Sequence, residues 1–158
     1  MPNMQVFRPA DAIETAECWA LAIKRADGPS TLALTRQGLP PLRHDVSVNL
    51  CEKGGYRLKA ADAEKRVVLI ATGSEVSLAM DIAAKLEAAG HGADVVSMPC
   101  TELFDAQSAD YRQASCGCRS RPGPHSAGSA IRGSTACASV STVSERLPRL
   151  KTSTPISV

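Results

Sequence analysis

One arginine stands out among the side chains that could bind a ligand. Arg36 follows a short apolar run, 31–35, and precedes the loop-forming residues 38–41. The glycine and prolines of that loop predict irregular backbone, so Arg36 is expected just beyond the carboxyl end of a strand. A guanidinium there can donate paired hydrogen bonds to a phosphate or a carboxylate. The alternative, commoner for a surface arginine, is a side chain that is only solvated.

The turn Thr72-Gly73-Ser74-Glu75 joins a predicted strand to a predicted helix. Helix N-termini bind anions, but the glycine spacing of phosphate-binding and dinucleotide-binding loops is absent. Glu75 would also repel a phosphate. Because Thr72 and Glu75 have the spacing of a capping box, the turn is expected to be a capped helix start.

The histidines and cysteines indicate neither a catalytic site nor a metal site. His44 has an acidic neighbour, but adjacent residues rarely face one site, and His91 and His125 are isolated. Cys100 has no identifiable base and is expected to be a packed thiol. The pair in Cys116-Gly117-Cys118 lacks a second ligand pair at zinc spacing. Free thiols in a reducing compartment are therefore expected.

The elements that would position these residues begin with a helix. An amphipathic helix is predicted over 11–25, before the strand that precedes Arg36. Four apolar residues at helical spacing should form its buried face, namely Ile13, Ala16, Ala20 and Ile23. Residues 42–54 have a weak pattern that predicts a linker, and residues 55–58 could begin a strand.

A βαβ unit follows. A strand is predicted over 66–70, where Val67-Val68-Leu69-Ile70 form a continuous apolar run rich in β-branched residues, typical of a parallel strand that is buried on both faces. A helix over 75–89 should end at Gly90. Its buried face should consist of Val76, Ala79, Met80, Ala83 and Leu86. A strand over 93–98 completes the unit, and residues 102–112 predict short helical turns.

The composition changes after Ala114. Residues 115–158 contain no aromatic side chain, and six basic residues stand against one acidic residue, Glu145. The rest of this segment is rich in Ser, Thr, Pro and Gly, which predicts a disordered tail. A basic tail can bind nucleic acid, but it lacks the aromatic side chains that stack on bases, so no nucleic-acid partner is expected.

No membrane association is expected either. The longest apolar runs are far too short to span a bilayer, and residues 1–4 lack the basic and apolar regions of a signal peptide. Together with the expected free thiols, these features predict a cytoplasmic protein.

Several stretches together resemble the C-terminal portion of a transketolase, in that family's order and approximate spacing. The stretches are Phe7-Arg8-Pro9-Ala10-Asp11, Leu34-Thr35-Arg36-Gln37-Gly38-Leu39-Pro40, Gly54-Gly55-Tyr56, Leu69-Ile70-Ala71-Thr72-Gly73-Ser74-Glu75-Val76, Val95-Val96-Ser97-Met98-Pro99, Phe104-Asp105-Ala106-Gln107 and Tyr111-Arg112. The resemblance implies an α/β chain made of partial parallel-sheet βαβ fragments of two domains. Residues 1–49 would end the pyrimidine-binding domain, residues 50–114 would begin the C-terminal α/β domain, and the tail would occupy 115–158.

The resemblance also implies a chemistry. Transketolases use thiamine diphosphate and a divalent metal to transfer a two-carbon ketol unit between sugar phosphates, at sites formed between the subunits of a homodimer. Arg36 matches the arginine of the family's Arg-Gln-x-Leu-Pro motif, which contacts the phosphate of the sugar. The family's Gly-Asp-Gly region, its cofactor-activating carboxylate and its catalytic histidines have no counterpart here, and His44 matches none of them. We therefore expect no catalytic, cofactor-binding or metal-binding residue, and no activity from this chain alone.

Two further hypotheses remain open. The chain could be a non-catalytic subunit that completes a split transketolase-like enzyme with a separate cofactor-binding chain, although such a subunit should keep a complete C-terminal domain. The tail could also result from a frameshift at about Ser115. Permissible codons for residues 118–123, read one nucleotide earlier, give Val-Ser-Ile-Glu-Ala-Gly, and codons through Ile131 continue this transketolase-like sequence.

A fragment with uncovered sheet edges and apolar faces is expected to aggregate.

Overall fold

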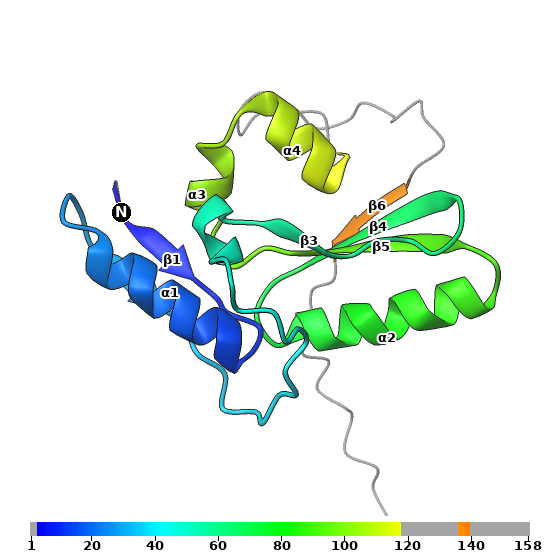
Figure 1. Cartoon of the computed structure of the whole chain (residues 1–158), viewed down its shortest axis with the longest axis horizontal. Helices are drawn as coiled ribbons and strands as arrows, with labels where there is room; N and C mark the ends of the chain where they lie inside the picture. Colours follow the sequence, from blue (N-terminus) through cyan, green and yellow to red (C-terminus); the bar gives the residue numbers. More distant parts are fainter. Residues whose placement is uncertain (1–2, 118–135, 140–158) are drawn as a thin grey trace, which may run out of the picture.

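The computed structural model describes residues 3–117 and 136–139. A small parallel sheet with one helix lies beside a larger mixed sheet that has helices on both faces (Figure 1). The elements in chain order are β1 (Gln5–Phe7), α1 (Ala12–Lys24), β2 (Ser30–Leu32), the 3₁₀ helix η1 (Leu50–Lys53), β3 (Tyr56–Lys59), β4 (Lys65–Ala71), α2 (Glu75–Ala88), β5 (Gly92–Ser97), α3 (Thr101–Asp105), α4 (Ala109–Cys116) and β6 (Ala136–Ser139).

The small sheet consists of β1 and β2, which pair in parallel and are connected through α1. Asp11 begins α1, because its side chain accepts a hydrogen bond from the Glu14 N–H at 2.8 Å. The predicted strand over 31–35 is displaced, since β2 ends at Leu32. Arg36 therefore lies several residues beyond the strand rather than immediately after it.

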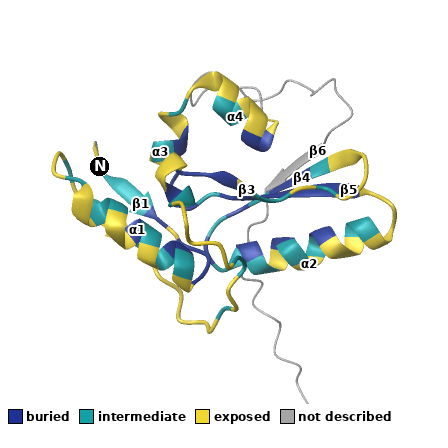
Figure 2. Cartoon of the chain, viewed as in Figure 1, coloured by how far each residue is buried: buried dark blue, intermediate teal, exposed yellow. Residues whose placement is uncertain are grey.

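The buried face of α1 differs from the predicted one. Glu14 and Cys18 are buried, whereas Ile23 is 76% exposed and Trp19 is 50% exposed. The predicted core residues Ala16 and Ala20 are also exposed, and exposed positions run along the outer side of α1 in Figure 2. Both sides of this helix carry apolar residues, so helical periodicity alone selected the wrong side.

The larger sheet has the strand order β3-β5-β4-β6. β4 is parallel to both β5 and β6, and β3 is antiparallel to β5. Successive β4 residues face opposite layers: Leu69 packs in a cluster with Val76 of α2, and Val68 packs with Phe104 and Cys116 of α3 and α4. This confirms the βαβ unit predicted over 66–98, and every residue of β5 is buried.

The two ends of α2 compare differently with the prediction. The N-cap is Ser74 rather than the predicted Thr72, and the Ser74 side chain accepts no capping hydrogen bond. The C-terminal end is as expected, because Gly90 follows the helix with a φ of +82°. Its N–H donates to the Glu87 carbonyl at 2.9 Å, as in a glycine-terminated helix.

Four further elements refine the predicted linker, helical turns and tail. The predicted linker over 42–54 contains η1, and the helical turns over 102–112 are α3 and α4. Beyond residue 114, α4 continues through Cys116, and β6 forms within the segment that was expected to be irregular throughout. The remaining tail residues lie outside the described part of the chain. Among described residues, no helix is long and apolar enough to cross a membrane.

Candidate functional site

Arg36, the predicted phosphate ligand, lies in the loop between β2 and η1 and is exposed. Its neighbour Thr35 accepts a hydrogen bond from the Gln37 N–H at 3.1 Å, which closes a tight turn around the arginine. Arg36 forms no ion pair with any residue that the structure describes. Its guanidinium is thus available to an anion from outside the described chain.

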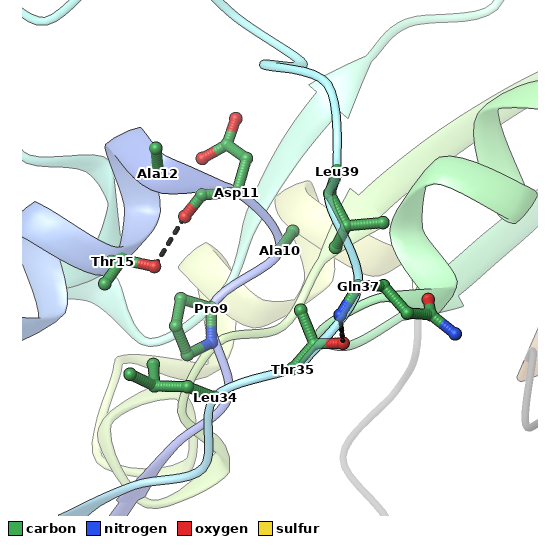
Figure 3. A pocket seen from close by; sticks show the side chains of 9 residues that line it. All are labelled: Pro9, Ala10, Asp11, Ala12, Thr15, Leu34, Thr35, Gln37 and Leu39. Atoms are coloured by element: carbon green, nitrogen blue, oxygen red, sulfur yellow. Dashed lines mark hydrogen bonds between the residues drawn. The ribbon is translucent and has the colours of Figure 1, made fainter.

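A pocket of about 240 Å³ lies between this loop and the start of α1 (Figure 3). Its wall consists of Pro9, Ala10, Asp11, Ala12, Thr15, Leu34, Thr35, Gln37 and Leu39. The two chain neighbours of Arg36 are thus part of the wall, although Arg36 itself is not. The Asp11 carboxylate caps α1 and accepts the Leu42 N–H at 2.9 Å, so its two oxygens are already used within the protein. The pocket is thus a mainly apolar hollow whose wall includes both chain neighbours of the exposed Arg36.

The histidines do not gather at this pocket. His44 is exposed in the same loop, and the adjacent Asp45 accepts the Ser47 N–H at 2.9 Å instead of orienting the imidazole. Hydrogen bonds from Ser47 lower the pKa of Asp45. His91 is exposed just after α2, and His125 lies outside the described residues. The structure therefore brings together no acid–base pair from these predicted candidates.

Cys100 and Cys116, two of the cysteines considered as nucleophile or metal ligand, are packed thiols. Cys100 is 1% exposed, and burial raises the pKa of its thiol to about 11. A thiol with that pKa is almost wholly protonated at neutral pH and is a poor nucleophile. Cys116 is also buried and donates to the Arg112 carbonyl at 3.0 Å, while Cys118 lies outside the described residues. Within the described chain, no three His, Cys, Asp or Glu side chains are placed to hold a metal ion.

Glu14 is an important polar residue that the sequence did not reveal. Its carboxylate is 2% exposed and accepts hydrogen bonds from the Ala10 N–H at 2.7 Å, the Tyr56 hydroxyl at 2.7 Å and the Ser97 hydroxyl at 2.6 Å. Burial raises the pKa of Glu14, an effect that these three donors partly oppose. The one available signal was its position three residues after Asp11, where an N3 acid often reaches back to a helix start.

The Glu14 cluster joins the two sheets. Glu14 belongs to α1, whereas its hydroxyl partners Tyr56 and Ser97 belong to β3 and β5. Nearby, Arg43 forms an ion pair with Glu17 of α1, and its guanidinium lies 5.5 Å from the centre of the Tyr56 ring. These contacts pack α1 against the larger sheet. Because their polar groups are engaged within the protein, the exposed Arg36 loop is the better candidate for a ligand site.

Two family models match the chain in succession. Residues 1–41 match the transketolase pyrimidine-binding domain, and residues 54–122 match the transketolase-like C-terminal domain. Among curated relatives, the transketolase of Rhodobacter capsulatus is 51% identical over 114 residues, which cover 71% of this chain and 17% of the relative. The chromosomal transketolase of Cupriavidus necator is 52% identical over 113 residues, again 71% and 17%.

Solved structures give the same result. A Pichia stipitis transketolase in complex with sedoheptulose 7-phosphate has a TM-score of 0.65 and 43% identity, over 72% of this chain and 17% of that one. A split-gene transketolase described as an inactive β4 tetramer has a TM-score of 0.55 and 34% identity, over 63% and 32%. The chain spans about a sixth of the length of the curated relatives that it matches. With two consecutive domain models matched and about half of the aligned residues identical, the chain belongs to the transketolase family.

Proposed function

We propose that the chain is a transketolase fragment that is inactive alone and whose Arg36 binds the phosphate of a sugar phosphate once the cofactor-binding part of the enzyme is supplied. The observation that carries this proposal is the exposed Arg36 in a turn whose flanking residues, Thr35 and Gln37, line the pocket beside α1. The solved complex of a relative with sedoheptulose 7-phosphate supports the ligand class. Ketol transfer by this family needs thiamine diphosphate, which supplies the carbanion chemistry.

The described residues do not fit that cofactor. No described cluster of potential metal ligands is present to anchor a diphosphate through a divalent ion. The two acids at the start of α1 are also engaged, since Asp11 caps the helix and Glu14 accepts three hydrogen bonds. We derive no catalytic step for this chain, and its cytoplasmic location stays a prediction.

Substitution of Arg36 by alanine tests the phosphate role. The test uses a chimera in which residues 1–114 of this chain replace the matching segment of the R. capsulatus transketolase. In that chimera, Arg36→Ala is expected to raise the KM for a sugar phosphate about 30-fold to 100-fold. The reason is the loss of a charge-assisted, paired hydrogen bond worth about 2–3 kcal/mol. Steady-state kinetics measures the change, and kcat should fall far less than KM rises.

The matched control for this experiment is Arg66→Ala. Arg66 is an exposed arginine of β4, and its side chain is 59% accessible. Its removal changes the net charge equally and should leave KM within about twofold, as expected for a solvated side chain. An unchanged KM in the Arg36→Ala chimera would refute the assignment of Arg36. Turnover by the unassisted chain of 158 residues would refute its proposed inactivity.

We also propose that the tail arose by a frameshift near Ser115. The curated relatives align over only 113 to 115 residues of the chain, in agreement with the change in composition. The nucleotide sequence of the gene is the direct test. The shifted frame should encode Val-Ser-Ile-Glu-Ala-Gly opposite residues 118–123, and stop codons there would exclude this explanation.

A second candidate function is favoured by the outer face of α1. Ala12, Ala16, Trp19, Ala20 and Ile23 form an apolar surface, here called the α1 outer face, whose members are all exposed. A helix that is apolar on both sides is normally buried on both. This face favours the split-enzyme alternative, in which a separate cofactor-binding chain packs against α1. A solved split-gene transketolase is a precedent for such a division.

Coexpression tests this alternative. The remaining N-terminal part of the R. capsulatus transketolase should copurify with the chain, whereas Trp19→Ser/Ile23→Ser should lose at least about 90% of the captured partner, since two large apolar contacts disappear. Leu78→Ser is the matched control because Leu78 of α2 is an exposed apolar residue, 42% accessible, on another element. Equal capture by all three proteins, or none by the unmodified chain, contradicts the split-enzyme hypothesis.

A further inference from the structure

Three buried thiols meet where α1 packs against the larger sheet. Cys18 of α1 and Cys51 of η1 are 0% exposed, and Cys100, which follows β5, is 1% exposed. All three belong to one apolar cluster together with Phe7 and Tyr56. The three cysteines come from segments far apart in sequence, so a covalent bond between any two would lock the packing of this junction.

The geometry selects one pair among the three. Cys18 and Cys51 lie in the same buried cluster, and Cys18 is the strongest influence that raises the pKa of the Cys51 thiol, so the two side chains are close neighbours. Their segments are also tied at Glu17, whose carbonyl accepts from Asn49 Nδ2 at 3.2 Å and whose carboxylate accepts from the Cys51 N–H at 3.3 Å. Cys100 is engaged elsewhere, because its Sγ donates to Glu102 Oε2 at 3.3 Å.

We propose that Cys18 and Cys51 are a modification site that forms a disulfide linking α1 to the segment leading into the C-terminal domain. The oxidant is a small-molecule disulfide of the glutathione type. The two cysteine thiols lose two protons and two electrons as their sulfur–sulfur bond forms. The bond of the small disulfide breaks and takes up both, leaving two free small thiols. This inference is independent of the phosphate-binding role of Arg36.

Burial determines when this reaction can occur. The neighbouring Cys18 and burial both raise the pKa of the Cys51 thiol, which suppresses the nucleophilic thiolate in the closed structure. Thiol exchange therefore requires folding or local opening, when the pair is accessible and not yet packed. The sequence predicts free thiols in a reducing compartment, so the disulfide should form only where the folding chain meets an oxidant of this type. Once the structure has closed, the same burial excludes reductants and the bond should persist.

Refolding of the complete chain in a buffer of reduced and oxidised glutathione tests the site. Digestion without reduction, followed by mass spectrometry, should show a Cys18–Cys51 peptide as the main linked product. The oxidised chain should melt about 10 °C above the reduced chain, because the crosslink restricts the unfolded ensemble between residues 18 and 51. Circular dichroism measures both melts.

Single substitutions separate this pair from the other thiols. Cys51→Ser should lose the linked peptide and the melting shift, whereas Cys100→Ser, from the same cluster, should keep both. A fully reduced melt of each variant shows whether the substitution itself altered folding. A main linkage through Cys100 or a tail cysteine, the absence of any linkage, or equal melting of the oxidised and reduced chains would overturn the proposal.

Discussion

Replacing Glu14 with alanine is expected to lower the free energy of unfolding by about 3–5 kcal/mol. The substitution removes the common acceptor of three buried donors, and each unsatisfied donor costs about 1–3 kcal/mol, offset where a hydroxyl can rotate to another partner. Domains of this size are stable by only about 5–15 kcal/mol, so the variant should lose a large share of its stability. Urea denaturation followed by circular dichroism measures the loss.

Glu14→Gln is the matched control, because the amide keeps the shape and can still accept one hydrogen bond and donate another. The difference in unfolding free energy between this variant and the unmodified chain should also depend on pH. Since burial raises the folded-state pKa of Glu14, the folded chain binds the proton more tightly than the unfolded chain. The stabilisation from this proton is complete below the unfolded pKa of about 4.5 and is lost as pH rises through the folded pKa.

The stability of the unmodified chain relative to Glu14→Gln should therefore fall as pH rises above about 4.5 and then become constant. A loss under 1 kcal/mol for Glu14→Ala would show that α1 does not depend on this carboxylate. A stability difference that grows with pH would show that the charged form is favoured by folding.

Gly54→Ala is expected to destabilise the fold strongly, because the new Cβ would clash with backbone atoms. Gly54 has a φ of +77°, which already costs a substituted residue about 1 kcal/mol. A Cβ at this position would also overlap the Phe104 nitrogen and the Cys100 carbonyl oxygen. Neither atom can rotate away, because the Cys100 N–H itself donates to the Gly54 carbonyl at 2.9 Å. We expect a loss of at least about 4 kcal/mol in urea denaturation.

Gly90→Ala isolates the contribution of the clash. Gly90 has a φ of +82°, similar to that of Gly54, but a Cβ there would meet nothing within 4 Å. The alanine variant should therefore lose only about 1 kcal/mol, the cost of the left-handed backbone. Equal losses at the two positions would mean that conformation alone, and not crowding by the α3 segment, explains the effect.

The sequence predicted the βαβ unit well because its signals are local. The continuous apolar run in β4 and the glycine after α2 determine those elements with little help from the rest of the fold. The exposed loop that carries Arg36 was also correctly anticipated from glycine and proline. The direction of β3, which pairs antiparallel to β5, depends on contacts between distant segments and has no counterpart in local periodicity.

The orientation of α1 could not be predicted for a related reason. Its apolar residues occupy both sides, and the buried side includes the acid Glu14, which periodicity assigned to solvent. Besides the nearby Ala10 N–H, that burial depends on the distant hydroxyls of Tyr56 and Ser97, which lie 42 and 83 positions away in the chain. The Glu14 cluster is thus a property of tertiary structure.

The junction of the two sheets is also held by main-chain atoms at Arg8. Its N–H donates to the Pro99 carbonyl at 2.8 Å, and its carbonyl accepts from the Gly73 N–H at 3.0 Å. Such bonds are offered by the backbone of nearly every residue type, so this part of the junction is insensitive to side-chain substitution. The segments before residue 41 and after residue 54 should therefore dock in the same register even when they come from divergent members of the family. This makes the stretch between residues 41 and 54 a suitable crossover point for chimeric enzymes.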